Sequence, residues 1–217
     1  DYCDGFINRK LDILDAGGGS GNFAALCLAR GHNLTLCDSS REMFEKARER
    51  LDSFINTRQL QLIECDFLAE DHFADANFDV VMIHGSAEWM GDTRSAIKKG
   101  CRLVRPDGYF SLLMFNRDKY VLKSGINGHL LDGKKSKKKK LVPPGAMTIA
   151  ETIQLLHSCG VEIVMQSGIR IFYKFFREVE EANMTREQWL EQERQYYRKH
   201  PFSLLGEHSH FLCRRRK

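Results

Sequence analysis

The stretch "LDILDAGGGSGNFAALCLARGHNLTLCDSS", residues 11–40, decides the fold. An apolar run, Leu11–Ala16, leads into four glycines within the five positions 17–21. A helical pattern over Asn22–Arg30 and a second apolar run over Asn33–Cys37 follow. Strand, glycine-rich turn, helix and strand in this order begin a doubly wound parallel sheet, and glycines this dense imply that some group approaches the backbone closely.

The same alternation of apolar runs and helical patterns continues along the chain. The apolar runs are continuous, as in strands that helices cover on both faces. Beyond residue 40 we expect strands at Leu60–Cys65, Phe78–His84, Tyr109–Phe115 and Val161–Phe172, and a last, antiparallel strand within residues 203–216. We expect helices at Arg41–Leu51, Thr93–Leu103, Thr148–Cys159 and Phe175–Arg198, and a turn at Pro106–Gly108. The sequence therefore predicts an α/β, Rossmann-like fold with a doubly wound, mostly parallel seven-stranded sheet and helices on both faces.

Composition predicts a globular protein of a reducing compartment. The 217 residues are 42% hydrophobic, enough for one sizeable core, and the formal net charge is +4. Seven scattered cysteines without a C-x-x-C pair indicate neither a zinc site nor a disulfide framework, and we expect no metal. No apolar run approaches the roughly 18 residues that a membrane span needs, so we expect a cytoplasmic protein. We expect a single domain over residues 1–217, with a truncated N-terminal segment and a basic loop insertion at about 117–147.

The residue before the glycines indicates which ligand the turn binds. Gly19, Gly21 and Ala24 satisfy the G-x-G-x-x-A pattern of dinucleotide sites, and a tight turn without any ligand is a further reading. However, Asp15 ends the first strand immediately before the turn. Its carboxylate would repel a pyrophosphate and would suit a ligand that carries an ammonium group. S-adenosylmethionine has an ammonium, a sulfonium and no phosphate, so we expect this cofactor rather than NAD.

Residues after the next strands complete the expected cofactor site. Asp38 ends the second strand and suits a carboxylate that accepts both ribose hydroxyls, which it would do for either cofactor. After the third strand, Asp66 or the neighbouring backbone could receive the adenine amino group while Phe67 covers the adenine ring. His84 ends the fourth strand, where a histidine is more often a cofactor or packing contact than a base.

Several motifs together resemble the bacterial tRNA 5-carboxymethoxyuridine methyltransferases: "LDAGGGSG" with "LCDSS", "FDVVMIHGSAEW", "LVRPDGYFSLLMFN", "KKKKL" and "SGIRIFYKFFRE". The H-x-x-x-E-W element, the lysine run and the G-[IV]-R-[IV]-F element are the specific ones. The resemblance implies a class I methyltransferase that transfers a methyl group from S-adenosylmethionine to the carboxylate of a modified wobble uridine in tRNA, which gives a methyl ester. It also implies cofactor contacts at Gly17, Gly18, Asp38, Phe67, Leu68 and His84.

Two further segments predict contacts with such a substrate. The lysine run could contact the tRNA backbone or form a solvated loop; its residues are Lys134, Lys135, Lys137, Lys138, Lys139 and Lys140. Arg170 has apolar neighbours on both sides, which predicts a buried strand in which its guanidinium needs an anionic partner. That partner is the carboxymethoxy group or an acid of the fold. Gly168 would let a nucleotide approach the backbone, and Tyr173 would stack on the base.

The expected chemistry needs no general base. A carboxylic acid with a pKa near 4 is already ionised at neutral pH, so the enzyme must mainly align the reactants and exclude water. The alternative is a small-molecule O- or N-methyltransferase with the same cofactor site. A non-catalytic RNA-binding protein would explain the lysines but would leave Asp15 and Asp38 without a role.

Overall fold

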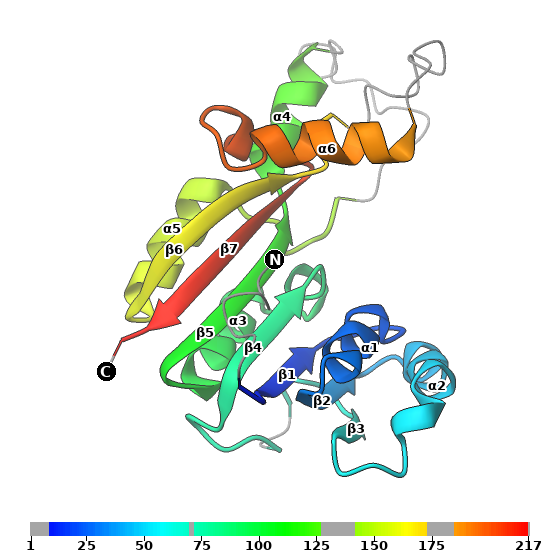
Figure 1. Ribbon diagram of the computed structural model, residues 1–217. Coiled ribbons are helices and arrows are strands. Elements are labelled where there is room, and N and C mark those ends of the chain that lie inside the picture. Colours follow the sequence, from blue (N-terminus) through cyan, green and yellow to red (C-terminus); the bar gives the residue numbers. More distant parts are fainter. Residues whose placement is uncertain (1–8, 70–71, 127–141, 173–184, 217) are drawn as a thin grey trace.

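A computed structural model describes residues 9–69, 72–126, 142–172 and 185–216, which build a single twisted sheet with helices around it (Figure 1). The sheet has seven strands in the order β3-β2-β1-β4-β5-β7-β6. Neighbouring strands are parallel, except that β7 is antiparallel to both β5 and β6. The strands are β1 (Asp12–Ala16), β2 (Asn33–Asp38), β3 (Leu60–Glu64), β4 (Phe78–His84), β5 (Val104–Phe115), β6 (Val161–Ile169) and β7 (His208–Arg215). The predicted fold class is confirmed.

Helices cover both faces of the sheet. The helices are α1 (Asn22–Ala29), α2 (Arg41–Arg50), α3 (Thr93–Leu103), α4 (Arg117–Ile126), α5 (Ile149–Ser158) and α6 (Arg186–Tyr196), with short 3-10 turns η2 (Asp52–Phe54), η3 (Ala87–Trp89) and η5 (Phe202–Leu204). Leu28 of α1 and Ala47 of α2 pack with Leu36 on one face, which we call the α1 face. Ile97 of α3 and Leu156 of α5 belong to the core on the opposite face. Because these strands are buried on both faces, their sequences are continuous apolar runs.

Local chemistry sets where the helices begin. Side chains cap three of the expected helices: Ser40 accepts a hydrogen bond from the N–H of Met43, Asp92 accepts one from Ser95, and Thr148 forms a capping box with Glu151. α1 differs, because its N-cap is Gly21 in the left-handed conformation, with φ +73° and no side-chain cap. The helix that follows the glycines therefore keeps its first N–H groups free of a capping side chain.

Three expectations about the second half are corrected. The turn expected at Pro106–Gly108 is an irregularity inside β5, since Val104 pairs with Phe78 and Tyr109 already pairs with Val80. The segment expected as a loop insertion opens with α4, so the loop prediction is wrong for residues 117–126. β6 ends at Ile169 rather than at residue 172. Residues 173–184 lie outside the described residues, so the start of the helix expected at Phe175–Arg198 stays a prediction, and its described part is α6.

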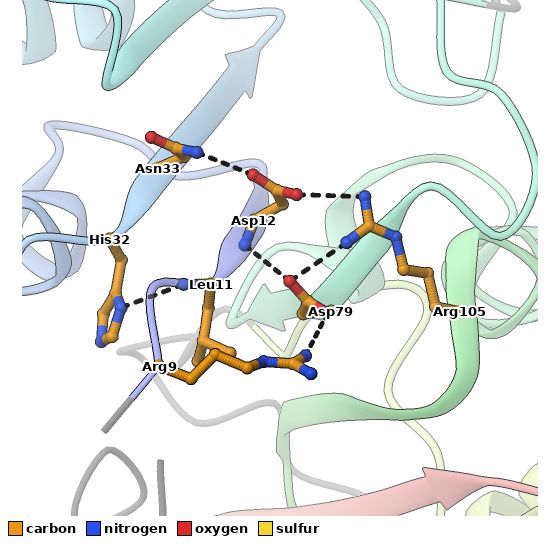
Figure 2. Close-up of polar contacts among 7 residues, drawn as sticks. All are labelled: Arg9, Leu11, Asp12, His32, Asn33, Asp79 and Arg105. Atoms are coloured by element: carbon orange, nitrogen blue, oxygen red, sulfur yellow. Dashed lines mark hydrogen bonds and ion pairs between the residues drawn. The ribbon is translucent and has the colours of Figure 1, made fainter. Parts of the chain in front are cut away.

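A network of charges joins strands at the end of the sheet opposite the glycines (Figure 2). The Asp79 carboxylate accepts from the N–H of Asp12 at 2.9 Å and pairs with Arg9 at 2.5 Å and Arg105 at 3.1 Å. Arg105 also pairs with Asp12 at 3.0 Å, and the second Asp12 oxygen accepts from Asn33 at 2.8 Å. The network therefore fastens β1, β2 and β4 to the irregular start of β5.

Asp79→Ala is expected to lower the free energy of unfolding by about 2–3 kcal/mol, because it leaves the main-chain N–H of Asp12 without its acceptor and removes the carboxylate that pairs with both Arg9 and Arg105. The Asp79 side chain is only 11% exposed, so solvent replaces little of what is lost. Asp75→Ala is the matched control, since Asp75 and Arg102 form a pair in which both side chains are more than half exposed. Urea denaturation measures both variants, and equal losses would contradict the assignment.

Candidate functional site

The candidate site lies where β1, β2 and β4 end. β1 lies between β2 on one side and β4 on the other, so the direction of winding reverses there, which is where open α/β sheets bind ligands. Asp15 pairs with Leu36 of β2 and with Met82 of β4. Asp38 and His84 are each two residues further along those strands. The structure thus brings Asp15, Asp38 and His84 to one edge, as the sequence predicts.

The groups that lie close to Gly17 and Gly18 are side chains of the protein itself. A Cβ on Gly17 would lie 2.5 Å from both Cβ and Oγ of Ser86, and φ there is +69°. A Cβ on Gly18 would lie 2.7 Å from Cδ1 of Leu36. Both N–H groups donate to the carbonyl of Cys37, at 2.8 and 3.2 Å. These two glycines therefore let the turn fold tightly over the strand ends, while Gly19 has nothing within 4 Å on its Cβ side.

Asp15 is a buried acid beneath this turn. Asp15 is 3% exposed, and a Cβ on Gly18 would lie 3.0 Å from its carboxyl carbon. Burial, with a smaller contribution from the charge of Asp38, raises the pKa of Asp15 to about 7. Within the described ranges no group donates a hydrogen bond to this carboxyl. A buried carboxylate is costly without a partner, so the site fits a ligand that brings an ammonium group.

Asp38 holds the turn and leaves room for a ligand. One carboxylate oxygen accepts from the N–H of Gly19 and the other from the N–H of Ser40, both at 2.8 Å. Asp38 thereby joins the glycine turn to the start of α2. Each carboxylate oxygen keeps a second lone-pair direction, which suits a pair of ribose hydroxyls.

The Phe67 side chain lies elsewhere than expected. Its ring is 3% exposed and packs in the core, 6.1 Å from the Phe73 ring, with the Lys99 ammonium 5.2 Å from its centroid. The ring therefore packs in the core in this structure. The N–H of Leu68 donates to the exposed Asp66 carboxylate at 2.8 Å. Cofactor contacts at Phe67 and Leu68 stay predictions.

His84 belongs to a chain of buried polar groups. Its Nε2 lies 2.8 Å from the Ser111 hydroxyl, which lies 2.9 Å from Nε2 of His210. Burial lowers the pKa of His84 to about 4, and burial with the charges of His84 and Arg198 lowers the pKa of His210 to about 3. Both rings are therefore neutral at neutral pH, and His84 is a poor general base. Sequence reasoning missed Ser111 and His210, which no local pattern marks.

Glu88, the acid of the H-x-x-x-E-W element, has a structural role. It is 2% exposed, and its Oε1 accepts from the N–H of Phe115 at 3.0 Å, just beyond the last pair of β4 with β5. Its main-chain carbonyl accepts from the N–H of Gly145 at 3.1 Å. Burial raises the pKa of Glu88. Glu88 thus fixes η3, the turn next to Ser86 and Met90, and both of these side chains border Gly17.

The surroundings of Arg170 differ from the expectation. Arg170 follows β6, is exposed, and has φ +59°, so the predicted buried strand around it is wrong. Close approach at Gly168 comes from the carbonyl of Phe202, 2.8 Å from where a Cβ would lie, rather than from a nucleotide. Tyr173 lies outside the described residues, as does the lysine run Lys134, Lys135, Lys137, Lys138, Lys139 and Lys140.

Comparison with known proteins assigns a class to this site. The family described as "Methyltransferase domain" matches residues 14–112, which include the glycine turn, Asp38 and His84. The tRNA 5-carboxymethoxyuridine methyltransferase of Escherichia coli is 29% identical over 211 residues, which cover 95% of this chain and 81% of that protein. The chain is an S-adenosylmethionine-dependent methyltransferase. The resemblance stated from the motifs is confirmed, and so is the expected cofactor.

Solved structures show the same fold for this methyltransferase. A putative sarcosine dimethylglycine methyltransferase from Galdieria sulphuraria aligns over 99% of this chain and 82% of its own, with a TM-score of 0.64 and 14% identity. A geranyl diphosphate C-methyltransferase from Streptomyces coelicolor, in complex with S-adenosyl-L-homocysteine, aligns over 99% and 77%, with a TM-score of 0.64 and 13% identity. At these identities the likeness concerns the fold.

No described helix of the methyltransferase is long and apolar enough to cross a bilayer. In the same ranges, no group of three or more His, Cys, Asp or Glu side chains is arranged to hold a metal ion.

Proposed function

We propose that this methyltransferase transfers the methyl group of S-adenosylmethionine to the carboxylate of 5-carboxymethoxyuridine at the tRNA wobble position and forms the methyl ester. The observation that carries the proposal is the extent of the likeness to the Escherichia coli protein of that name. It covers 95% of the chain, whereas the general methyltransferase domain ends at residue 112. The likeness therefore includes β6 and most of the chain beyond residue 112, which lie outside the general domain.

The chemistry of the site is compatible with a carboxylate acceptor. Such an acceptor is already ionised at neutral pH, so its oxygen needs no base to become a nucleophile. Bound S-adenosylmethionine supplies an electrophilic methyl group and a neutral thioether as leaving group. Asp15 would pair with the ammonium of this cofactor and Asp38 with its ribose. His84 is neutral, so it does not repel the positive sulfonium.

Arg170 is the candidate to hold the acceptor carboxylate. It directly follows Ile169, which pairs with His208 of β7, and His208 pairs with Phe115 at the end of β5. Arg170 therefore lies at the same edge of the sheet as His84, and its exposure suits a substrate that arrives from solution. A guanidinium holds a carboxylate by two parallel hydrogen bonds, which would orient the reacting oxygen. The lysine run as a tRNA contact, Tyr173 as a stacking residue and a cytoplasmic location belong to the same proposal.

Arg170→Lys is expected to lower kcat/KM for tRNA more than about tenfold and to leave cofactor affinity unchanged, because lysine keeps the charge but loses the two-pronged geometry. Nucleoside analysis after incubation with tRNA measures the ester, and calorimetry measures cofactor binding. Arg216→Lys is the control, since Arg216 is an exposed arginine that pairs with Glu162 at 3.2 Å beyond the other end of β7.

A second comparison tests the reaction itself. Wild-type protein is expected to esterify tRNA that carries 5-carboxymethoxyuridine and to leave tRNA with an unmodified wobble uridine untouched. Methylation of both tRNAs, or of neither, would overturn the proposed substrate. A normal rate for Arg170→Lys would remove Arg170 from the acceptor site and leave the reaction standing.

A further inference from the structure

We propose that Glu193 of α6 is a positioning residue: its carboxylate holds the main chain around Arg170 in a left-handed turn and so fixes the direction in which the Arg170 side chain leaves the edge of the sheet. The proposal rests on the proposed function, because Arg170 is the residue that we assign to the acceptor carboxylate. It deepens that function by giving a role to a helix that lies outside the general methyltransferase domain, which ends at residue 112.

The Glu193 carboxylate binds two successive main-chain N–H groups. Its Oε2 accepts from the N–H of Ile171 at 3.0 Å, and its Oε1 accepts from the N–H of Phe172 at 2.8 Å. Successive N–H groups that converge on one anion form a main-chain nest, in which a left-handed residue commonly takes part. Arg170, the residue just before these two, is left-handed, with φ +59°. The carboxylate and the conformation of Arg170 therefore stabilise each other.

The main chain is also held before and at Arg170. The N–H of Gly168 donates to the carbonyl of Tyr197 at 2.8 Å, and the carbonyl of Arg170 accepts from the N–H of Glu207 at 3.4 Å. A residue with a Cβ is disfavoured at positive φ and keeps such a conformation only where its surroundings hold it. Glu193 supplies the part of this support that follows Arg170 in the chain.

Aromatic packing fixes the helix that carries Glu193. Tyr196 is three residues further along α6, so the two side chains share a face of the helix. The Tyr196 ring meets the Phe172 ring with centroids 5.9 Å apart and the Phe202 ring with centroids 4.8 Å apart. α6 thus crosses the end of β6, and it holds Phe172 by both its N–H and its ring (Figure 1). The Glu193 carboxylate is therefore an anchored group rather than a mobile surface charge.

A fixed direction at Arg170 matters for methyl transfer. The acceptor oxygen, the methyl carbon and the sulfur must lie in line, and a small misplacement of the acceptor lowers the rate strongly. The guanidinium stands at the end of a long side chain, so the direction in which that side chain starts decides where the acceptor is held. Loss of Glu193 should therefore slow methylation without weakening the binding of the cofactor.

The charge of Glu193 also acts on a lysine of α4. Burial lowers the pKa of the half-buried Lys119, with a smaller contribution from the charge of Lys123, and the charge of Glu193 opposes this lowering. Glu193 could thus stabilise the protein through Lys119 and have no effect on Arg170. The two roles differ in one respect: only the role that we propose requires the Arg170 side chain.

Amide hydrogen exchange of the whole chain tests whether the carboxylate holds the turn. In the wild-type protein the N–H groups of Ile171 and Phe172 are expected to be protected. Glu193→Ala is expected to speed the exchange of both about tenfold or more, because hydrogen bonds to a charged acceptor are the strong ones. Gly168, whose N–H donates to Tyr197, is expected to keep its protection. Unprotected wild-type groups, unchanged exchange in the variant, or an equal loss at Gly168 would overturn the proposal.

A double-mutant cycle tests whether Glu193 acts through Arg170. Glu193→Ala is expected to lower kcat/KM for tRNA with 5-carboxymethoxyuridine about tenfold and to leave cofactor affinity unchanged. In an Arg170→Ala background, which has no guanidinium to aim, the same change is expected to cause no further loss. A full additional loss there would overturn the proposal. Glu191→Ala is the matched control, an exposed acid of the same helix whose carboxylate lies 3.6 Å from Arg194.

The outcomes separate this inference from the proposed function. A wild-type protein that esterifies neither tRNA would defeat the proposed function, whatever the exchange rates are. A wild-type protein that is active on tRNA with 5-carboxymethoxyuridine, together with a Glu193→Ala variant of equal activity, would defeat only the inference. The exchange experiment needs neither tRNA nor cofactor, so it reports on the turn independently of the acceptor.

Discussion

Asp15→Asn is expected to make the folded protein more stable above pH 7 and to weaken its binding of S-adenosylmethionine. Burial raises the pKa of Asp15 from 3.8 to about 7 in the folded state. Between these values the folded state holds a proton that the unfolded chain has lost, so wild-type stability falls as the pH rises through this range and levels off above it. A shift of this size corresponds to a loss of up to about 4 kcal/mol at pH 8, which an uncharged asparagine avoids.

The same substitution removes the partner of the cofactor ammonium. Wild-type affinity is expected to rise with pH through about 7, as Asp15 ionises, and the asparagine variant to bind at least about tenfold more weakly at pH 8. Urea denaturation and calorimetry between pH 5 and pH 8 measure both effects. Glu45→Gln on the exposed side of α2 is the control for loss of one negative charge. A variant no more stable than wild type at pH 8, with unchanged affinity, would show that Asp15 is neither strained nor in contact with the cofactor.

Gly17→Ala is expected to cost about 3 kcal/mol or more of folding free energy and to abolish cofactor binding. The added Cβ would lie 2.5 Å from the Ser86 side chain, in a backbone conformation with φ +69°. The conformation alone costs an alanine about 1–2 kcal/mol, and the overlap forces η3 away from the turn. Gly19→Ala separates the cost of the backbone conformation from the cost of the overlap. At Gly19 φ is +55°, but no atom lies within 4 Å of an added Cβ.

Thermal unfolding with and without cofactor measures these variants. Gly19→Ala is expected to lose only the conformational part of the stability, about 1–2 kcal/mol. Adding Ser86→Gly to Gly17→Ala removes the two atoms that overlap most, Cβ and Oγ of Ser86, and is expected to restore part of the stability. If Gly17→Ala and Gly19→Ala were equally stable, contact with η3 would not be the reason for glycine at position 17.

The first half of the fold can be predicted from local sequence. β4 has the expected bounds, Phe78–His84, and the bounds of β1 and β2 differ from the expected ones by one residue. These strands are buried on both faces, so each is an apolar run that stops at a glycine or a charge. The same topology predicts that Asp15 and Asp38 meet at one edge.

The second half of the fold and the site residues that it contributes depend on contacts between residues that are distant in sequence. The pattern Ile169-Arg170-Ile171 resembles a buried strand, but Arg170 adopts a left-handed conformation that its residue type does not indicate. α4 has a charged sequence next to the lysine run and gives no clear apolar stripe. Ser111 and His210 are 99 residues apart, and only the antiparallel pairing of β5 with β7 brings them together.

The place of β7 in the sheet has a consequence for how the chain is made. β6 lies at the edge of the sheet, and β7 is its neighbour there, between it and β5. During synthesis β6 therefore leaves the ribosome before the strand that ties it to the sheet exists. Until residues 208–215 emerge, β5 and β6 both present unpaired backbone groups, which are open to pairing with other chains. The nascent protein is then most exposed to aggregation in the interval between the synthesis of β6 and that of β7, and a chaperone that binds extended apolar segments would have its main effect in that interval.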